Sequence, residues 1–165
     1  MDQIGHRLVV HPDVAFLEAD ARVLRQHRLA GLADAAQVRL IPGSGVDCSR
    51  FLASTPGHAD GRPLRVLLPA RLLWDKGIAE YVAAARQLRG EGRALAFLLA
   101  GDPDPGNPAA VPEATVRGWV DEGLVEWLGH VDDMPVLFAS VDMVVLPSYR
   151  EGLPKGLIEA AACAL

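Results

Sequence analysis

From residue 64 onward, short apolar runs alternate with longer segments in which apolar residues recur at a helical period. The runs predict strands over residues 64–69, 94–100, 125–128 and 143–146. The segments between them predict helices over residues 76–90, 112–122 and 133–140, and a further helix begins at Pro154. In the first helix, one face carries Ile78, Tyr81, Val82, Ala85 and Leu88. Continuous apolar strands separated by helices are typical of a parallel sheet covered on both faces, so the pattern predicts a Rossmann-like α/β fold.

The first part of the chain is less regular. A short apolar run predicts a strand over residues 7–11. Asp13 then opens an amphipathic pattern, which predicts a helix that continues to about Leu29 and stops at Gly31.

A second short strand is predicted over residues 38–41, followed by a loop that contains Gly43, Ser44 and Gly45. Its two glycines allow either a sharp turn or a close approach of the backbone to a ligand. Residues 53–63 are rich in proline and glycine and predict an exposed connection.

Composition narrows the class of protein. A chain of 165 residues with 50% hydrophobic content can bury one sizeable core. The net charge of −5, with 16 Lys and Arg residues spread thinly, argues against a nucleic-acid partner. Two cysteines far apart in sequence favour reduced core thiols and a cytoplasmic protein. No apolar stretch is long enough for a transmembrane segment, and the five histidines lack metal-ligand spacing, so no metal site is predicted.

Two cations follow the first strand of the alternating region. Arg71 and Lys76 lie in the loop that begins at Pro69. Ligands of a parallel sheet bind beyond the carboxyl ends of its strands, where two cations can meet a pyrophosphate. The alternative is that both side chains are simply solvated.

The stretch from Ser148 to Glu159 follows the last predicted strand. Pro154 is expected at the first helical position, so that the N–H groups of Lys155, Gly156 and Leu157 point out of the helix start and attract an anion. Glu151 and Glu159 flank this helix start. The arrangement suits a sugar attached to a phosphate.

Glu151 and Glu159 form an E-x7-E pattern within Pro-Ser-x-x-Glu-Gly-Leu-Pro. This context resembles the signature of the retaining family-4 glycosyltransferases, which have the GT-B fold. The resemblance extends over nearly the whole chain. It implies that residues 1–52 are the end of an N-terminal domain and an interdomain linker, and that residues 53–165 are an incomplete Rossmann-like donor-binding domain, truncated before its last strands.

The resemblance also implies roles for individual residues. Arg71 and Lys76, in the pattern Arg-x4-Lys-Gly, would hold the donor diphosphate and stabilise the charge that develops as it leaves, without a metal ion or other cofactor. Glu151 would face the transferred sugar, and Glu159 would bind the ribose hydroxyls. Further donor-binding residues would be Gly152, Leu153, Pro154, Gly43, Ser44, Gly45 and Gly101. Ala164 departs from the family pattern, which commonly has glycine there.

Glycosidase chemistry is a weaker interpretation of the two glutamates. Glycosidase carboxyls lie roughly 5–9.5 Å apart. Eight helical residues would separate the two backbones by about 12 Å, so separate roles along an extended ligand fit better.

The sequence therefore predicts the nucleotide-sugar binding part of a retaining glycosyltransferase. Such an enzyme would transfer a hexosyl or N-acetylhexosaminyl group, carried on UDP, to a glycan or lipid-linked acceptor in polysaccharide biosynthesis. The chain alone is expected to bind donor and to transfer nothing. Two alternatives remain, a non-catalytic nucleotide-sugar-binding module and a GT-B nucleotide-sugar epimerase. A cytoplasmic location, with peripheral contact to the inner face of the membrane in the full-length enzyme, is expected.

Overall fold

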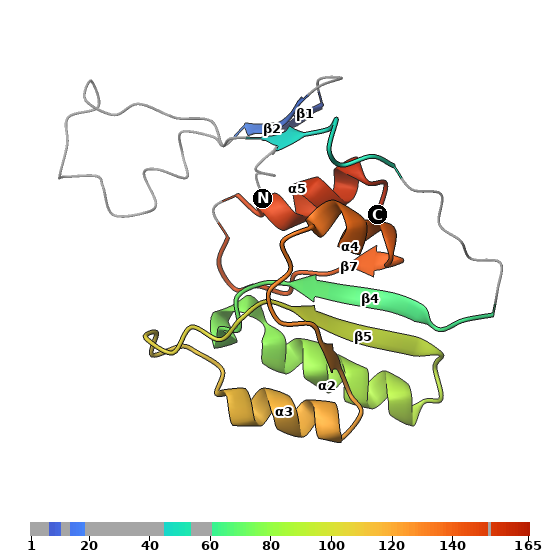
Figure 1. Ribbon diagram of the computed structural model, residues 1–165, viewed down its shortest axis with the longest axis vertical. Coiled ribbons are helices and arrows are strands. Elements are labelled where there is room, and N and C mark those ends of the chain that lie inside the picture. The colour runs from blue at the N-terminus through green and yellow to red at the C-terminus, as the bar shows by residue number, and fades with distance from the viewer. Residues whose placement is uncertain (1–6, 11–13, 19–44, 54–60, 152) are drawn as a thin grey trace, which may run out of the picture.

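The computed structural model describes residues 7–10, 14–18, 45–53, 61–151 and 153–165. Within them, a four-stranded parallel sheet has the order β6-β5-β4-β7, and a three-stranded antiparallel sheet has the order β1-β2-β3 (Figure 1). The parallel sheet with its helices confirms the predicted α/β fold. The division into domains at residue 52 stays a prediction.

The parallel sheet is built around the first of its strands. Its members are β4 (Leu64–Pro69), β5 (Leu95–Ala100), β6 (Glu126–Trp127) and β7 (Met143–Val144). The chain runs outward from β4 through β5 to β6, and then crosses back to place β7 on the other side of β4. The loops that follow β4 and β7 therefore diverge from a topological switch point, where sheets of this kind bind ligands. All four strands were predicted, but β6 and β7 are shorter than expected because two residues of each pair with a neighbour.

Helices cover both faces of this sheet. The 3₁₀ turn η3 (Trp74–Lys76) leads into α2 (Ile78–Gly90), and α3 is Glu113–Asp121. The other helices are α4 (Met134–Ala139) and α5 (Lys155–Ala162). Figure 1 shows α2 and α3 on one face, and α4 and α5 on the other.

Each face has its own apolar core, because neighbouring strand residues point in opposite directions. Val66 and Leu68 of β4 pack with Ile78 of α2, whereas Leu67 packs with Phe138 of α4. Of the predicted α2 face, Ile78, Tyr81, Val82 and Ala85 are buried and Leu88 is partly buried.

Tyr81 connects α2 to both central strands. Its side chain is 3% exposed. The hydroxyl accepts a hydrogen bond from the Leu98 N–H at 3.1 Å and lies 2.7 Å from the Val66 carbonyl oxygen, to which it donates. Burial raises the pKa of this phenol, and the Leu98 backbone opposes the rise only in part. The hydroxyl therefore stays a donor at any physiological pH.

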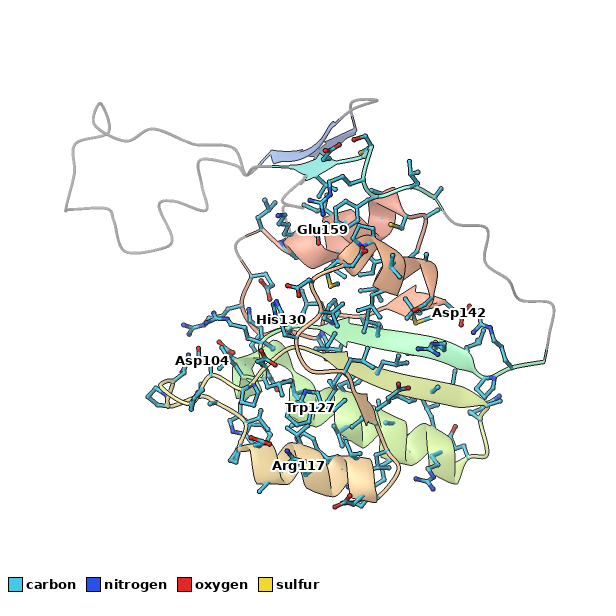
Figure 2. All side chains as sticks on the ribbon, in the orientation of Figure 1. Asp104, Arg117, Trp127, His130, Asp142 and Glu159 are labelled. Carbon is cyan, nitrogen blue, oxygen red and sulfur yellow. The ribbon has the colours of Figure 1, made fainter. Side chains whose placement is uncertain are left out.

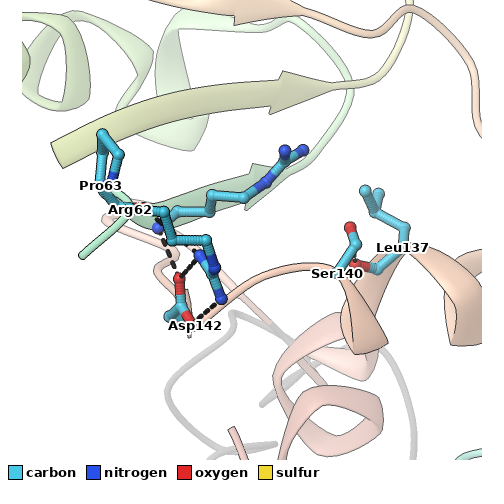
Figure 3. A network of polar contacts seen from close by, with 6 residues as sticks. Arg62, Pro63, Leu137, Ser140 and Asp142 are labelled. Atoms are coloured by element: carbon cyan, nitrogen blue, oxygen red, sulfur yellow. Dashed lines mark hydrogen bonds and ion pairs between the residues drawn. The ribbon is translucent and has the colours of Figure 1, made fainter. Parts of the chain in front are cut away.

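At the amino end of the sheet, an ion pair ties β7 to the start of β4. Arg62 donates to both carboxylate oxygens of Asp142 at 2.6 and 2.7 Å, and Asp142 also accepts from the Arg65 N–H at 2.7 Å (Figure 3). The Asp142 side chain is 3% exposed. This bidentate contact fixes the strand pairing at the end of the sheet remote from the loops after β4 and β7.

The N-terminal segment differs from the prediction. β1 (Arg7–Val10) confirms the predicted first strand, but Val14–Glu18, expected to begin a helix, forms β2, which pairs antiparallel with β1 and with β3 (Val46–Asp47). A short apolar run that contains valine and phenylalanine fits the period of a helix as well as that of a strand. Pairing with β1, a few residues away, favours the strand. The rest of that predicted helix and the strand over residues 38–41 lie outside the described residues.

Residues 45–51 join the core of the parallel domain. β3 contacts α5, and the rings of Phe51 and Phe138 have centroids 6.1 Å apart. At the other end of the chain, α5 stops in a left-handed turn. Ala164 has φ 64°, and the Leu165 and Ala164 N–H groups donate to the carbonyls of Ala160 and Ala161 at 3.1 Å each. This Schellman arrangement normally uses glycine at the position of Ala164.

Candidate functional site

Two adjoining cavities lie beyond the carboxyl ends of the parallel strands. The large cavity, about 670 Å³, is bordered by the loops after β4 and β5, by His130 and Val131, and by Gly156 and Glu159 of α5. The small cavity, about 150 Å³, is bordered by Lys76, Glu151 and the start of α5. Pro69, Ala70, Arg71 and Gly156 border both. Figure 2 shows Asp104 and His130 at this end of the sheet, and Asp142 at the opposite end.

Lys76 and Glu151 form an ion pair in the small cavity. Lys76 Nζ donates to Glu151 Oε1 at 2.8 Å, and the two side chains are 18% and 26% exposed. Burial, the largest single influence, raises the pKa of the Glu151 carboxyl, but hydrogen bonding with Lys76 and Ser148 and the charge of Lys76 together outweigh it, so this pKa lies below its ordinary value. Glu151 is thus held as a carboxylate against a cation.

The loop after β7 is joined to η3 by further contacts. The Tyr149 N–H and the Ser148 hydroxyl both donate to the Asp75 carbonyl, at 2.9 and 3.2 Å. The Tyr149 hydroxyl donates to the Glu80 carboxylate of α2. These contacts place the Lys76 ammonium beside Glu151 although the residues come from loops far apart in sequence.

Two glycines permit the close approach of the loops. A β-carbon on Gly101, with φ 149°, would lie 2.0 Å from the Ala70 carbonyl oxygen. One on Gly77, with φ 73°, would lie 2.2 Å from the Pro147 carbonyl oxygen. Gly101 was predicted to belong to the site. The packing role of Gly77 was not predicted, although a glycine directly after Lys76 indicates a backbone conformation that other residues rarely adopt.

Arg71 is paired with the loop after β5. Its Nη1 donates to Asp104 Oδ2 at 3.0 Å, with side chains 66% and 34% exposed. Asp104 was not among the predicted site residues. Its position between Pro103 and Pro105 was the available signal, because prolines on both sides restrict the backbone.

Glu159 occupies the second turn of α5. Its carboxylate lies 3.6 Å from Lys155 Nζ and its side chain is 12% exposed. It borders the large cavity and also a third cavity of about 330 Å³, which Gly45, Asp47 and Arg50 border as well. Glu151 borders the small cavity instead. The two glutamates therefore face different spaces, as separate roles along one extended ligand require.

The helix start differs from the prediction in detail. Pro154 caps α5, and Lys155 is the first helical residue. The Lys155 N–H donates to the Leu153 carbonyl at 2.8 Å, and the Leu157 N–H to the Pro154 carbonyl at 2.9 Å. The prediction that the Lys155 and Leu157 N–H groups point outward to an anion is therefore wrong, whereas for the Gly156 N–H it stays a prediction. The helix dipole still directs positive potential into the small cavity.

The remaining predicted site residues are dispersed. Pro154 borders the small cavity, whereas Leu153 packs against the core beneath α4 and α5. Gly45 has φ 64° and borders the third cavity. Gly43, Ser44 and Gly152 lie outside the described residues.

In the part of the chain that the structure describes, His, Cys, Asp and Glu side chains form no group of three or more that could hold a metal ion. Nor does any described helix have the length and apolar character needed to cross a membrane. Cys48 and Cys163 are both free thiols, as expected, and burial followed by the Glu159 charge raises the pKa of Cys163.

Comparison with known proteins identifies the family. The model of a family described as "Glycosyl transferases group 1" matches residues 63–165. The chain belongs to this family. All of the residues that border the large and small cavities lie within the matched region.

Two curated proteins are similar to the chain. It is 36% identical over 106 residues to the N,N'-diacetylbacillosaminyl-diphospho-undecaprenol alpha-1,3-N-acetylgalactosaminyltransferase of Campylobacter jejuni, which covers 64% of this chain and 26% of that protein. It is 32% identical over 100 residues to the alpha-D-kanosaminyltransferase of Streptomyces kanamyceticus, covering 61% and 25%. The chain thus spans about a quarter of the length of these relatives.

A solved structure shares the fold. The crystal structure of Anabaena Alr3699/HepE in complex with UDP and glucose matches with a TM-score of 0.56 and 22% identity, over 72% of this chain and 34% of that one. The parallel α/β fold of this chain is therefore that of the GT-B structures.

Proposed function

We propose that the two adjoining cavities form the donor site of a retaining glycosyltransferase, which transfers a sugar from a UDP-sugar to a glycan or lipid-linked acceptor. The observation that carries the proposal is the position of Arg71 and Lys76. Both border the small cavity at the switch point of the sheet, beside the start of α5, in a chain whose net charge is −5. A diphosphate is the anion that two cations and a helix start suit best.

The large cavity suits the nucleoside. Its volume of about 670 Å³ falls within the usual range of small-molecule sites. Glu159, mostly buried at its wall, offers carboxylate oxygens that can accept hydrogen bonds from both ribose hydroxyls. Because Arg71 and Gly156 border both cavities, a nucleoside in the large one places its diphosphate in the small one.

Glu151 would then face the sugar. Its carboxylate neutralises Lys76 in the ion pair described above. When a diphosphate engages the Lys76 ammonium, the Glu151 carboxylate becomes available to accept hydrogen bonds from sugar hydroxyls. The two glutamates would bind opposite ends of the donor, which is the arrangement that the E-x7-E resemblance implies.

Catalysis would depend on stabilising the leaving diphosphate. As the bond from the sugar to phosphate breaks, negative charge grows on the phosphate oxygens, and Arg71 and Lys76 can stabilise it more strongly in the transition state than in the bound donor. Two fixed cations supply positive charge at this point, so we propose that transfer requires no metal ion. Retention of anomeric configuration is inferred from the E-x7-E pattern alone.

The choice of UDP and of the acceptor class draws on the relatives. HepE is described in complexes with UDP and with UDP-glucose, and the name of the Campylobacter relative specifies a sugar linked to diphospho-undecaprenol. An acceptor on such a lipid would bring the full-length enzyme to the cytoplasmic face of a membrane. This chain, which spans about a quarter of the length of its relatives, is expected to bind the donor without transferring it.

Calorimetric titration of the chain with UDP, GDP and UDP-sugars tests the proposal. We expect UDP to bind, and we expect Lys76→Ala and Glu159→Ala each to weaken binding by tenfold or more, as loss of a charge-assisted contact worth about 1.5–3 kcal/mol requires. Glu113→Ala is a matched control, because Glu113 forms the same kind of i,i+4 ion pair, with Arg117 on α3, away from both cavities. Equal UDP affinity in the parent and both site variants would refute the assignment. Addition of EDTA should leave binding unchanged.

A further inference from the structure

The loop after β5 is attached to the loop that carries Arg71. The Leu72 N–H donates to the Asp102 carbonyl at 3.0 Å, and the Val111 N–H donates to the Leu72 carbonyl at 2.8 Å. The Trp74 N–H donates to the Ala109 carbonyl at 2.8 Å. Leu72 and Val111 are fully buried. Residues 101–111 are therefore a fixed extension of the sheet edge that runs beside residues 70–74.

The backbone at Asp104 is held in place within this extension. Its carbonyl accepts from the Asn107 N–H at 2.9 Å, and the Asn107 side chain in turn accepts from the Ala109 N–H at 2.9 Å. Pro103 and Pro105 restrict the backbone on either side. The Asp104 carboxylate consequently projects from a backbone with few alternative conformations.

The Arg71 side chain, in contrast, is held mainly by its hydrogen bond to Asp104. Its side chain is 66% exposed, and its hydrogen bond to Asp104 uses only Nη1. A long exposed arginine samples many rotamers, and an anion that binds it must arrest them. One bond to a fixed carboxylate restricts the guanidinium, while four of its five N–H groups remain for other acceptors.

The position of Asp104 relative to the cavities bears on whether it helps or hinders binding of the diphosphate. Asp104 borders the large cavity, whereas Arg71 borders both. Arg71 therefore connects the two cavities, and Asp104 contacts it from the side of the large one. From there Asp104 can orient Arg71 without occupying the space that the diphosphate would use.

We propose that Asp104 is a positioning residue, which holds the Arg71 guanidinium at the boundary between the two cavities in the orientation that receives the donor diphosphate. The inference rests on the proposed function, because it assigns the diphosphate to the small cavity. It assigns a function to the backbone hydrogen bonds that join residues 70–74 to residues 101–111.

The opposite role would also follow from an ion pair. If Asp104 competed with the diphosphate for Arg71, its removal would tighten binding. If Asp104 positions Arg71, removal of the Asp104 carboxylate should weaken diphosphate binding. Asparagine keeps an oxygen acceptor but not the charge, so Asp104→Asn should retain most of the affinity that alanine loses. The two roles therefore predict changes of opposite sign.

The experiment is calorimetric titration of the chain with UDP and, separately, with uridine, which lacks the phosphates. We expect Asp104→Ala to weaken UDP binding about three- to fivefold, the range for an exposed ion pair, and to leave uridine binding within about twofold. Asp104→Asn should bind UDP within about twofold of the parent. In an Arg71→Ala background, Asp104→Ala should have no further effect, because the group that it positions is gone.

Glu122→Ala is the matched control. Glu122 forms an exposed ion pair with Arg86 at 2.8 Å and borders neither cavity, so UDP binding should not change. Unchanged or tighter UDP binding by Asp104→Ala would overturn the positioning role, as would equal losses for UDP and uridine. If the parent binds no UDP, the proposed function itself fails, whereas binding that depends on Arg71 but not on Asp104 overturns this inference alone.

Discussion

Gly77 and Pro147 approach so closely that a β-carbon on Gly77 would lie 2.2 Å from the Pro147 carbonyl oxygen. Gly77 follows Lys76 directly, and Pro147 lies in the loop that leads from β7 to Glu151. The Lys76–Glu151 ion pair therefore depends on a backbone contact that no larger residue permits.

Replacement of Gly77 by alanine should disturb both stability and the site. The left-handed backbone, with φ 73°, costs an alanine about 1–2 kcal/mol, and the clash adds to it. We expect a loss of at least that much in the free energy of unfolding, measured by urea denaturation, together with weaker UDP binding. Gly118→Ala is the control, because Gly118 lies within α3 with open space around it, and alanine there should add about 0.5–1 kcal/mol. A Gly77→Ala protein as stable as the parent would contradict the contact.

The Glu151 carboxyl should make stability depend on pH. Its pKa in the folded chain is lowered from the ordinary value of 4.5 by its net interactions, so its contribution is fully present above pH 4.5 and is lost as the pH falls through the folded value. Urea denaturation at pH 7 should show Glu151→Gln to be less stable than the parent by up to about 1 kcal/mol. At about pH 3 the difference should shrink.

The partner variant provides the control for this pH dependence. In a Lys76→Met background, the Glu151→Gln change should no longer alter stability at pH 7 to the same extent, because the cation that lowers the carboxyl pKa is absent. A difference between parent and Glu151→Gln that stays constant from neutral to acidic pH would show that the ion pair does not contribute.

Loss of the Tyr81 hydroxyl should weaken the junction of α2 with β4 and β5. Tyr81→Phe leaves the buried Leu98 N–H and Val66 carbonyl without the hydroxyl partner, at a cost of about 1–3 kcal/mol. Thermal and urea denaturation measure it. Tyr149→Phe is a matched control, because the hydroxyl of this exposed tyrosine contacts the exposed Glu80 carboxylate, and its loss should cost less than about 0.5 kcal/mol. Equal effects of the two changes would contradict the role of Tyr81.

Ala164→Gly should stabilise the chain. Alanine at φ 64° is strained, and glycine removes that strain at the helix terminus, with an expected gain of up to about 1 kcal/mol in the free energy of unfolding. The same substitution within the exposed face of α5, Ala161→Gly, should instead cost about 0.5–1 kcal/mol. A loss of stability in both variants would argue against the left-handed turn.

The sequence predicted the parallel region because its local signals agree. The apolar runs at β4 and β5 are too short for helices, and the period that buries Ile78, Tyr81, Val82 and Ala85 matches the observed face of α2. At Val14–Glu18 the local signal was ambiguous, and pairing with β1 decided the structure. Strand pairing is a non-local interaction, which a single-sequence period does not contain.

The candidate site was predicted by position more than by contact. Placement of Arg71, Lys76 and Glu151 beyond strand ends followed from the strand–helix alternation. Their pairing did not, because the choice of Glu151 for Lys76 and Asp104 for Arg71 depends on which loops meet in space. Whether the Lys155 and Leu157 N–H groups form backbone hydrogen bonds likewise depends on how the loop enters α5.

The switch in strand order has a consequence for the order in which the site forms during folding. Arg71 and Asp104 are 33 residues apart and meet once β4 pairs with β5, whereas Lys76 and Glu151 are 75 residues apart and meet only after β7 has crossed back to β4. Closure of the longer loop costs more chain entropy and comes later. Arg71 thus takes its place with the first strand–helix–strand unit, whereas Lys76 meets its partner only when β7 has joined the sheet, so that ligand binding at the small cavity reports assembly of all four described strands.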